Sequence, residues 1–561
     1  MKILRVDMTK LQTRFEDLPE DWIVVGGRGL SAKILRKEVP PATNPLSAEA
    51  RLVIACGPLA GTLAPSCGRI SVGGKSPLTM GIKETNAGGP TAQKLDKLGI
   101  RAIVVEGAPK DGKLRLLVID KGGATLRDAD EYKGMKTYTL VEALQKHGKN
   151  TAVISIGPAG ERKWKGASVA FTDKDGHPAR HAGRGGMGAV MGAKGLKAIV
   201  VDDSGTPAVP IADKAAFREA MTGWPEVIQS DGQLKAFSQL GTPFGIVALR
   251  GLGSMPSKNY SSEGTPGVEN IGGEALARLR QERGGRMDGC MPGCIVKCSI
   301  IFHDADGKHV TSAFEYETIA LLGTNLGIAD PDELARMDRF CDEMGLDTIE
   351  LGSAMGVAAS RGKMEMGNAA SAWALLEEVE KGTEFGATLG NGVVATARAL
   401  DVTRIPAFKG QAIPAHDGRV CKAVGVTYAT SPMGADHTAG LSYEEPMAKE
   451  GKVEKSFEMQ VMMGMVDSLG YCLLASPSDH GAALAFLKNL VNARYGLSVS
   501  EEDLMEIGRQ TLRDELRFNE GAEFNSIHGP DPAFIRNEPL APTGSVFDVD
   551  PDEVASIWDR L

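Results

Sequence analysis

Three closely spaced cysteines and a fourth far along the chain are the residues best suited to chemistry. Cys290, Cys294 and Cys298 stand at four-residue intervals in RMDGCMPGCIVKCS, and Cys472 follows in MVDSLGYCLL. Four thiolates, one for each iron, hold a cubane 4Fe–4S cluster. The pattern therefore indicates an iron–sulfur cluster and electron transfer.

Two other interpretations of the cysteines stay open. A zinc ion also takes four thiolates, although structural zinc sites usually draw them from two close pairs. Reduced, buried thiols that bind nothing are the second alternative. An unbroken helix would hold Cys290 and Cys298 about 12 Å apart, which is too far for one small cluster. Pro292 and Gly293 predict a loop there instead.

Two glycine-rich segments that contain arginine predict contacts to an anionic, phosphate-bearing ligand. One extends from GPLAGTLAPSCGRISVGGKSP into KETNAGGP, and the other is ARHAGRGGMGAVMGAKGLK. Backbone amides exposed by glycine, next to arginine, form a nest that phosphate can fill. The candidate residues are Arg69, Asn86, Gly88, Arg180, His181, Gly183 and Arg184. A plain tight turn at the surface has much the same composition, so that alternative stays open.

Two turns that begin with aspartate share one pattern. DEMGLD, from Asp342 to Asp347, and DSLGYC, from Asp467 to Cys472, each have an Asp, two residues, then Gly and a bulky residue. Such carboxylates can accept hydrogen bonds from the amino and amide donors of a heterocycle. An Asp that only begins a turn or caps a helix is the alternative. The pairing favours a heterocycle, because the second turn runs directly into the fourth cluster cysteine.

Composition limits the class of protein. The chain has 561 residues and a net charge of −9, which argues against nucleic acid as a partner, because nucleic acid selects clustered Lys and Arg. Its 69 glycines exceed the usual share of ~7% and predict many tight turns. No apolar run reaches the about 20 residues of a membrane span, and the N-terminus has no secretory apolar stretch. We expect a cytoplasmic protein with reduced cysteines.

The elements that must position these residues fall into three regions, and the expected fold class is α+β. Residues 1–206 contain short β-branched runs, which predict a β-rich domain. Within it, GIRAIVVEGA and GLKAIVVDDS are alike, which indicates an internal pseudo-repeat with two comparable binding faces. Residues 207–408 carry the cysteine triplet and the first Asp turn, and residues 409–561 carry the second turn. Longer helical patterns predict that both are mainly α-helical domains.

Taken in order, these segments resemble the aldehyde:ferredoxin oxidoreductase family of tungsten–pterin enzymes. The resemblance runs from VGGRGL to the C-terminal VFDVD. It implies that the N-terminal domain binds two pterins, whose dithiolene sulfurs hold tungsten, with molybdenum as the alternative metal. It also implies a magnesium ion that links the pterin phosphates and one 4Fe–4S cluster beside the pterins.

The resemblance also assigns roles to individual residues. It makes Cys290, Cys294, Cys298 and Cys472 the cluster ligands, with Cys472 as the electron exit between pterin and cluster. It makes the seven candidates of the glycine-rich segments the pterin and phosphate contacts of the N-terminal domain. One pterin-binding turn would use Asp342, Leu346 and Asp347, and the other Asp467 and Tyr471.

Two further residues match the active-site pair of that family. Glu317, in FEYETIALLG, stands at the position of its glutamate, and His437, in SPMGADHTAG, at that of its histidine. A carboxylate and an imidazole at the metal could orient the aldehyde, or its hydrate, and take the proton released on oxidation. The alternatives are a carboxylate on a helix surface and a loop histidine bonded to backbone. Glu315 is the candidate if the register is shifted by two.

The expected function is oxidation of an aldehyde, with water, to the carboxylic acid. Electrons would leave through the cluster to ferredoxin or a ferredoxin-like iron–sulfur subunit, and a low-potential donor would allow the reverse reaction. One alternative is a related tungsten–pterin reductase subunit that acts on an aromatic acyl thioester or acid. Another is a non-enzymatic protein for electron transfer or cofactor storage.

The chain departs from the family in three places. Three residues separate Cys290 from Cys294, where members often have two. Met433 stands where some members place a pterin-contacting arginine. No histidine lies three residues after a glutamate, so the E-x-x-H motif that joins two subunits through a metal is missing. Homo- and hetero-oligomers are therefore both left open.

Overall fold

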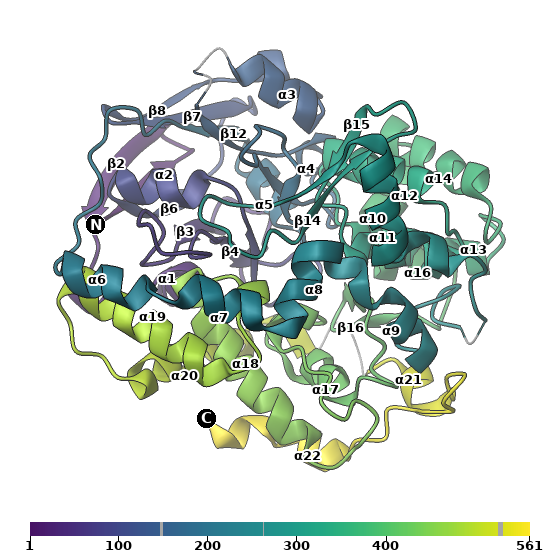
Figure 1. Cartoon of the computed structure of the whole chain (residues 1–561). Helices are drawn as coiled ribbons and strands as arrows, with labels where there is room; N and C mark the ends of the chain where they lie inside the picture. The colour runs from purple at the N-terminus through teal and green to yellow at the C-terminus, as the bar shows by residue number, and fades with distance from the viewer. Residues whose placement is uncertain (146–147, 149, 262, 526–530) are drawn as a thin grey trace.

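The β-branched runs of the first 206 residues form two six-stranded sheets, drawn in purple to blue in Figure 1. The structure is a computed structural model that describes residues 1–145, 148, 150–261, 263–525 and 531–561. The first sheet consists of β1 (Lys2–Asp7), β2 (Gln12–Asp17), β3 (Leu52–Cys56), β4 (Ile70–Lys75), β5 (Ile82–Ala87) and β6 (Ile100–Glu106). Its central strands β3 and β6 are buried almost throughout and mostly apolar, because helices and the other sheet cover them.

The second sheet repeats the topology of the first. It consists of β7 (Arg115–Asp120), β8 (Gly123–Asp128), β9 (Ala152–Ser155), β10 (Val169–Phe171), β11 (Arg180–Ala182) and β12 (Leu196–Val201). The order is β2-β1-β6-β3-β4-β5 in one sheet and β8-β7-β12-β9-β10-β11 in the other. In both, the first and last strands in sequence pair in parallel. The two similar segments are β6 and β12, so the predicted internal duplication is present in the fold.

Five helices accompany the sheets. They are α1 (Gly27–Glu38), α2 (Thr91–Lys97), α3 (Thr137–Leu144), α4 (Pro158–Glu161) and α5 (Met187–Ala193). Leu30, Ile34 and Leu35 on α1 share an apolar core with Val53 of β3 and Phe518 of the C-terminal region. This packing holds the first sheet against the helices that follow it in the sequence.

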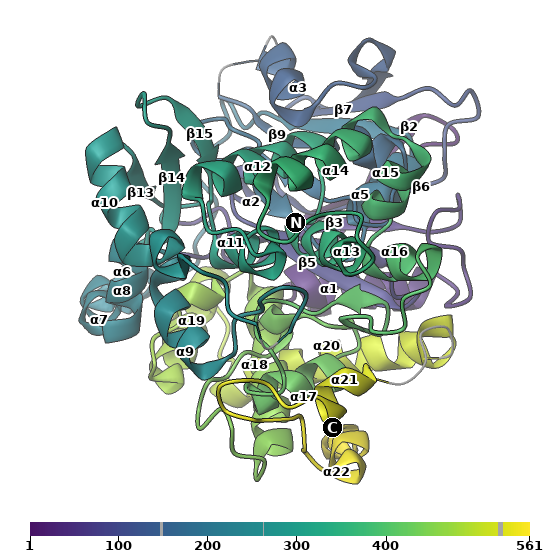
Figure 2. The ribbon, with the colours of Figure 1, turned by 90° about the vertical axis from the view of Figure 1, so that its right-hand side faces the viewer.

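Helices dominate the rest of the chain, which confirms the predicted α+β class. The middle region contains α6 (Lys214–Met221), α7 (Trp224–Ser230), α8 (Gly232–Leu240), α9 (Ile246–Leu252), α10 (Gly273–Arg283), α11 (Tyr316–Leu322), α12 (Pro331–Met344), α13 (Thr348–Ser360), α14 (Ala369–Lys381), α15 (Glu384–Gly390) and α16 (Val393–Ala399). A small sheet of β13 (Arg286–Asp288), β14 (Ser299–His303) and β15 (His309–Ser312) interrupts them. Figure 2 shows α12 to α16 grouped on one side of the molecule.

The last region lies below the others in both views (Figures 1 and 2). It contains β16 (Ala407–Phe408), β17 (Gln411–Ala412), α17 (Lys422–Thr430), α18 (Lys452–Leu469), α19 (His480–Tyr495), α20 (Glu501–Glu520), α21 (Ala533–Asn537) and α22 (Pro551–Ala555). One apolar core includes Leu376 and Val424, so the predicted domain boundary at residue 408 stays a prediction. Over the part of the chain that the structure describes, none of the helices has the length and apolarity that crossing a membrane requires.

Candidate active site

The cysteine triplet lies in a loop between two strands. β13 ends at Asp288 and β14 begins at Ser299, so Cys290, Cys294 and Cys298 all belong to this connection. The segment is not helical, and Gly293 has φ +77°, as its Pro-Gly sequence predicts. The loop therefore avoids the spread that a helix would impose on the three thiols.

Two backbone hydrogen bonds bring Cys472 to this loop. The amide of Cys472 donates to the Ser66 carbonyl at 3.0 Å, and the amide of Ser66 donates to the Gly293 carbonyl at 3.2 Å. A hydrogen bond to Cys290 and burial raise the pKa of the Cys294 thiol, and the charges of Cys290, Cys472 and Cys298 raise it further. The four thiols are thus near neighbours, and the other three oppose the ionisation of Cys294.

The spacing of the thiols favours a cluster over zinc. In the described parts of the chain, a metal-sized group of ligand atoms, all within 4.8 Å of one another, forms only at Glu317, His416 and His437. No three of the four thiol sulfurs therefore all lie within 4.8 Å of one another. A zinc ion with Zn–S bonds of about 2.3 Å would place its sulfurs roughly 3.8 Å apart. A cubane, with irons and sulfides between its ligands, separates them further.

The first glycine-rich segment meets the second Asp turn, and we call this contact the first half-site (Arg69, Asn86, Asp467 and Gly470). Arg69 donates through Nε to Oδ1 of Asn86 at 2.5 Å, and Asn86 donates through Nδ2 to Oδ1 of Asp467 at 3.2 Å. The amide of Arg69 donates to the Gly470 carbonyl at 3.0 Å. These hydrogen bonds connect the residue before β4 with β5 and with the end of α18.

The duplicated sheet makes the same contact with the first Asp turn, which we call the second half-site (Ser168, His181, Asp342 and Gly345). The amide of Ser168 donates to the Gly345 carbonyl at 2.9 Å. Nδ1 of His181 lies 2.7 Å from Oγ of Ser168, and its Nε2 lies 3.1 Å from Oδ1 of Asp342. Ser168 precedes β10 as Arg69 precedes β4, and His181 lies on β11 as Asn86 lies on β5. The two half-sites are therefore related by the duplication.

Both Asp turns end their helices in the same way. Gly345 after α12 and Gly470 after α18 have φ of +70° and +67°. The amide of Leu346 donates to the carbonyl five residues earlier at 3.0 Å, and that of Tyr471 does the same at 3.1 Å. This is the Schellman ending, which a left-handed glycine permits. Both motifs are therefore turns at helix ends, and these turns place their Asp side chains beside the sheets.

Two glycines of the sheets let these turns approach. A Cβ added at Gly57, after β3, would lie 2.0 Å from the last carbonyl of α18. One added at Gly157, after β9, would lie 2.3 Å from the last carbonyl of α12. Our sequence analysis did not single out either residue. The Gly-Pro pair that recurs in CGPLAG and IGPAG could have identified both glycines.

The remaining predicted contacts lie around the half-sites. Gly88 adjoins the cysteine loop, since a Cβ there would lie 2.8 Å from Sγ of Cys290. Arg180 is buried and donates to Oγ of Ser299 at 2.6 Å. The space beside Gly183 is open, because a Cβ there meets no atom of the described chain within 4 Å.

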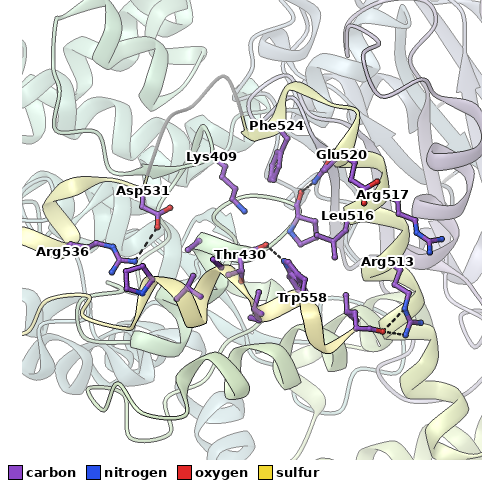
Figure 3. A pocket seen from close by; sticks show the side chains of 18 residues that line it. Lys409, Thr430, Arg513, Leu516, Arg517, Glu520, Phe524, Asp531, Arg536 and Trp558 are labelled. Carbon is purple, nitrogen blue, oxygen red and sulfur yellow. Dashed lines mark hydrogen bonds and ion pairs between the residues drawn. The ribbon is translucent and has the colours of Figure 1, made fainter.

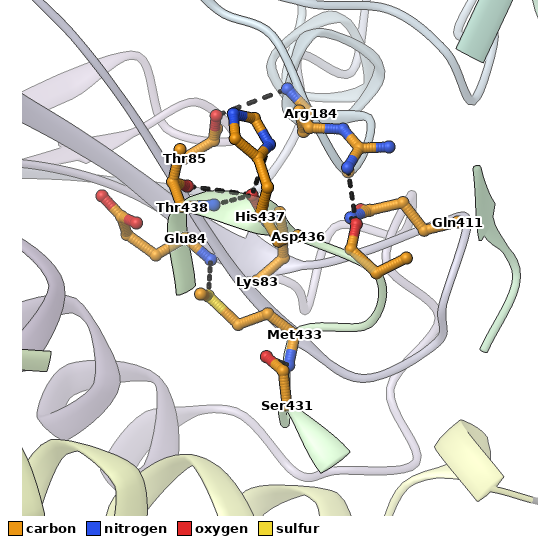
Figure 4. Close-up of polar contacts among 12 residues, drawn as sticks. Lys83, Glu84, Thr85, Arg184, Gln411, Ser431, Met433, Asp436, His437 and Thr438 are labelled. Carbon is orange, nitrogen blue, oxygen red and sulfur yellow. Dashed lines mark hydrogen bonds and ion pairs between the residues drawn. The ribbon is translucent and has the colours of Figure 1, made fainter. Parts of the chain in front are cut away.

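Arg184 and Tyr471 direct their side chains to partners within the protein. Arg184 donates to the carbonyls of Ala435 and Ala412 at 2.5 and 2.7 Å, and its Nε lies 3.4 Å from Asp347. Figure 4 shows how this guanidinium reaches the segment that carries His437. The hydroxyl of Tyr471 donates to the Ala475 carbonyl at 2.5 Å, so it is already paired within the protein.

Glu317 faces two histidines. It lies in the first turn of α11, and its Oε1 is 3.0 Å from Nε2 of His416 and 3.5 Å from Nε2 of His437. The amide of Ala415 donates to its Oε2 at 2.8 Å. Burial would raise the pKa of Glu317, but the two imidazoles and this amide outweigh burial and lower the pKa to about 2. The carboxylate is therefore ionised at neutral pH.

His416 belongs to this site, although our sequence analysis missed it. Its Nδ1 is hydrogen-bonded to the hydroxyl of Tyr443, and its ring stacks on Tyr316 with centroids 5.1 Å apart. Its ring centroid is 5.2 Å from that of His437. The segment IPAHDG shows only a lone loop histidine, and no spacing within the chain links it to Glu317.

Glu315 points elsewhere. It accepts a hydrogen bond from Oγ1 of Thr242 at 2.6 Å, and its charge acts on Cys298 and Arg180. Two residues along a helix start lie on different faces. The residue beside His437 is thus Glu317, and Glu315 lies toward the cysteines.

Lys83, Asp436 and Met433 support the segment that carries His437 (Figure 4). Asp436 forms a buried ion pair with Lys83 and accepts hydrogen bonds from the amide and hydroxyl of Thr438 at 3.2 and 2.9 Å. The amide of Glu84 donates to Sδ of Met433 at 3.3 Å. A neutral thioether therefore contacts backbone at the position where the family resemblance placed an arginine.

Unpaired buried polar atoms test whether a polar heterocycle fits here. Several such atoms of the described chain have no hydrogen-bond partner, among them Glu84 Oε1, Arg180 Nε, Asp342 Oδ2 and His437 Nδ1. Burial raises the pKa of Asp467 to about 8 and that of Asp342 well above its ordinary value. Donors of a bound heterocycle would restore their ionised forms. The residues therefore fit such a ligand.

A cavity of about 650 Å³ lies apart from this site, between α20 and the C-terminal helices (Figure 3). Lys409 and Trp558 point into it, and Lys409 donates to the Ser431 carbonyl at 3.2 Å. Neither Glu317 nor any cysteine lines it, so we do not assign the redox chemistry to this cavity.

Comparisons with known proteins agree with this geometry. Residues 3–203 match the family model "Aldehyde ferredoxin oxidoreductase, N-terminal domain", and residues 219–547 match "Aldehyde ferredoxin oxidoreductase, domains 2 & 3". The tungsten-containing aldehyde ferredoxin oxidoreductase of Pyrococcus furiosus is 32% identical over 92% of this chain and 88% of its own. That of Thermococcus kodakarensis is also 32% identical, with the same coverage.

A relative of lower identity and a solved structure of the same fold also match. The aliphatic sulfonate oxidoreductase, WOR-like subunit, of Pyrococcus furiosus is 28% identical over 84% of this chain and 80% of its own. A chain of the active-site complex BamBC of benzoyl coenzyme A reductase, solved with 1,5-dienoyl-CoA, shares the fold at a TM-score of 0.80 and 20% identity. It covers 100% of this chain and 93% of its own. Because the two family models span nearly the whole chain, the protein is an oxidoreductase that belongs to the aldehyde ferredoxin oxidoreductase family.

Proposed function

We propose that the protein oxidises an aldehyde, with water, to the carboxylic acid and passes the electrons out through one 4Fe–4S cluster. The observation that carries this proposal is the convergence of three parts. The Arg184 and Gly470 contacts connect the two duplicated half-sites, the four neighbouring thiols, and Glu317 with its histidines. Each part alone has other uses, but together they provide for a redox cofactor, an exit for electrons and a proton acceptor.

The half-sites would hold the two pterins of a tungsten cofactor. Asp467 and Asp342 would accept hydrogen bonds from the pterin rings, and the open space beside Gly183 leaves room near Arg180 for phosphate with magnesium. The metal, bound by the pterin sulfurs, would supply the two-electron redox chemistry. Molybdenum could occupy the same place, because no protein ligand in this proposal selects between them.

The chain's own residues would manage the proton. Burial lowers the pKa of His437, so its imidazole is neutral at pH 7, while the charge of Glu317 acts in the opposite direction. A neutral imidazole can accept a proton from water or from an aldehyde hydrate. Glu317, ionised and within 3.5 Å, would then stabilise the imidazolium. The carboxylate orients and stabilises, and the imidazole accepts the proton.

Metal analysis and dye reduction test the function together. Protein from a tungsten-supplied host should contain about one tungsten or molybdenum and four irons. It should also reduce viologen dye when given an aldehyde. Absence of both heavy metals from such protein would contradict the cofactor, and a metal-replete protein without aldehyde-dependent dye reduction would contradict the reaction.

Replacing His416 by glutamine should lower kcat/KM about tenfold, the size of one hydrogen bond to a charged group. Besides burial, the charge of His416 lowers the pKa of His437, so in the variant this pKa should rise and the acid limb of the pH–rate profile should move to higher pH. Steady-state kinetics across pH measure both effects. Tyr443→Phe, which removes only the hydroxyl behind His416, is the matched control and should cost less. An unchanged rate and pH profile in His416→Gln would remove His416 from the site.

The second candidate keeps the cofactors but changes the substrate to an aromatic acyl thioester or acid, as one subunit of a complex. The fold shared with the benzoyl coenzyme A reductase chain keeps this candidate open. Aldehyde-dependent dye reduction by the isolated chain would favour the first candidate. Activity that requires an acyl thioester and partner subunits would favour the second.

A further inference from the structure

We propose that the surface around Leu63 and the cysteine loop is the docking surface for a small acidic iron–sulfur protein that receives the electrons. We call it the Leu63 surface, and it consists of Leu63, Pro292, Gly293, Ile295 and Lys297. The inference rests on the proposed function, because it takes the four thiols as the exit for electrons.

Leu63 is unusually exposed for its type. Its side chain is 84% exposed, whereas the other exposed large apolar residues of the described chain lie between 37% and 56%. A single exposed leucine is ordinary on a protein surface. What sets Leu63 apart is the segment that follows it.

The residues after Leu63 pack directly on the cysteine loop. The amide of Ser66 donates to the Gly293 carbonyl at 3.2 Å, and the amide of Gly68 lies 3.2 Å from Sδ of Met291. The carbonyl of Ser66 accepts from Cys472. The segment therefore lies between the cysteine triplet and the fourth thiol, with Leu63 at its outer end.

Two of the four thiols are almost fully buried, and the other two lie beside exposed residues of the Leu63 surface. Cys298 and Cys472 are 9% and 8% exposed and belong to an apolar core with Trp224 and Phe486. Cys290 and Cys294 are half-buried, and Pro292 and Gly293 between them are exposed. An acceptor seated on the Leu63 surface would thus stand where the cysteines come nearest to solvent.

Charge indicates an acidic partner. Lys297 is exposed, and its ammonium has no acidic partner among the residues that the structure describes. The buried guanidinium of Arg180 donates to Oγ of Ser299, the residue after Cys298, at 2.6 Å. The chain as a whole carries −9, so its net charge does not by itself attract an acidic protein. A small apolar patch with local positive charge fits the weak, transient interfaces of electron transfer.

Ferredoxin binding and dye reduction separate docking from catalysis. The probe is an acidic bacterial two-cluster ferredoxin, titrated calorimetrically into holoenzyme. In Leu63→Asp, the Kd and the KM for ferredoxin should rise at least about tenfold, as for loss of a central interface residue. Aldehyde-dependent viologen reduction and the EPR signal of the cluster should be unchanged. Lys297→Glu should raise the Kd as well and weaken its dependence on salt.

Phe15→Asp is the matched control. Phe15 is 41% exposed on β2, at the edge of the first sheet opposite to β5 and the cysteines, so ferredoxin binding should be unchanged. Leu63→Ser, a milder change, guards against a folding defect in Leu63→Asp and should show the same effect in smaller measure.

Three results would overturn the inference. One is an unchanged ferredoxin Kd in both Leu63→Asp and Lys297→Glu. Another is a lost EPR signal with equal loss of dye and ferredoxin reduction in Leu63→Ser, which would make Leu63 a support of the cluster. The third is a change of oligomeric state with an unchanged Kd, which would assign the surface to a second copy of the chain. A wild-type protein that binds ferredoxin without oxidising aldehydes would contradict the proposed function alone.

Discussion

Replacing Glu317 by glutamine should lower kcat/KM for aldehyde oxidation by roughly 10²–10⁴, because proton transfer to His437 loses the carboxylate that stabilises its imidazolium. Glutamine keeps the shape of the side chain and can still accept the hydrogen bond of the Ala415 amide. It cannot carry the negative charge that lies 3.5 Å from His437. Tungsten or molybdenum, iron content and fold should therefore survive while turnover falls.

The pH dependence of this variant follows from the same charge. In the wild type, burial lowers the pKa of His437 and the charge of Glu317 raises it. Glutamine removes the raising contribution, so the pKa of His437 should fall further. If neutral His437 is the proton acceptor, the acid limb of the pH–rate profile lies below pH 6.5 in the wild type and moves to lower pH in Glu317→Gln.

Glu315→Gln is the control for Glu317→Gln. Glu315 is half-buried two residues away but bonds to Thr242, and its charge acts on Cys298. Its replacement should leave the pKa of His437 in place and affect aldehyde oxidation less. Full activity in Glu317→Gln combined with a large loss in Glu315→Gln would reverse the assignment of the two glutamates.

Local chemistry explains which parts of the site the sequence could predict. Pro292 and Gly293 forbid a helix, so the loop that gathers the cysteine triplet follows from two residue types. Gly345 and Gly470 both follow an Asp at a helix end, so the two turns follow from the left-handed conformation that glycine permits. The similar strands β6 and β12 revealed the duplication, because a strand buried on both faces is a continuous apolar run.

The missed residues depend on packing between distant segments. His416 meets Glu317 across 99 positions of the chain only because the segment after β17 contacts α11, and a lone loop histidine carries no sign of that. Ser168 stands where Arg69 stands in the other sheet, and serine alone does not identify a ligand contact. Arg184 has the composition of a phosphate contact, yet its guanidinium donates to two carbonyls of the segment before His437. Which donors remain free is decided by tertiary structure.

Replacing Cys472 by serine should cost iron and electron transfer while aldehyde binding and the pterin half-sites remain. Serine keeps the backbone hydrogen bond to Ser66, so the loop should hold its place. A hydroxyl replaces the soft thiolate that iron–sulfur clusters require. We expect fewer irons per chain, or an altered EPR signal, and loss of most aldehyde-dependent dye reduction.

Cys67 is the alternative candidate for the fourth cluster ligand, so its replacement tests the assignment of Cys472. It is buried beside Cys472, whose charge contributes with burial to raising its pKa, and its Sγ lies 3.4 Å from the Pro65 carbonyl. If Cys472 is the ligand, Cys67→Ser keeps its iron. Cys421→Ser, in a core remote from the cluster and already 3.1 Å from the Ser254 hydroxyl, controls for loss of any buried thiol. Iron loss in Cys67→Ser with full iron in Cys472→Ser would move the fourth ligand to Cys67 and separate the second Asp turn from the cluster.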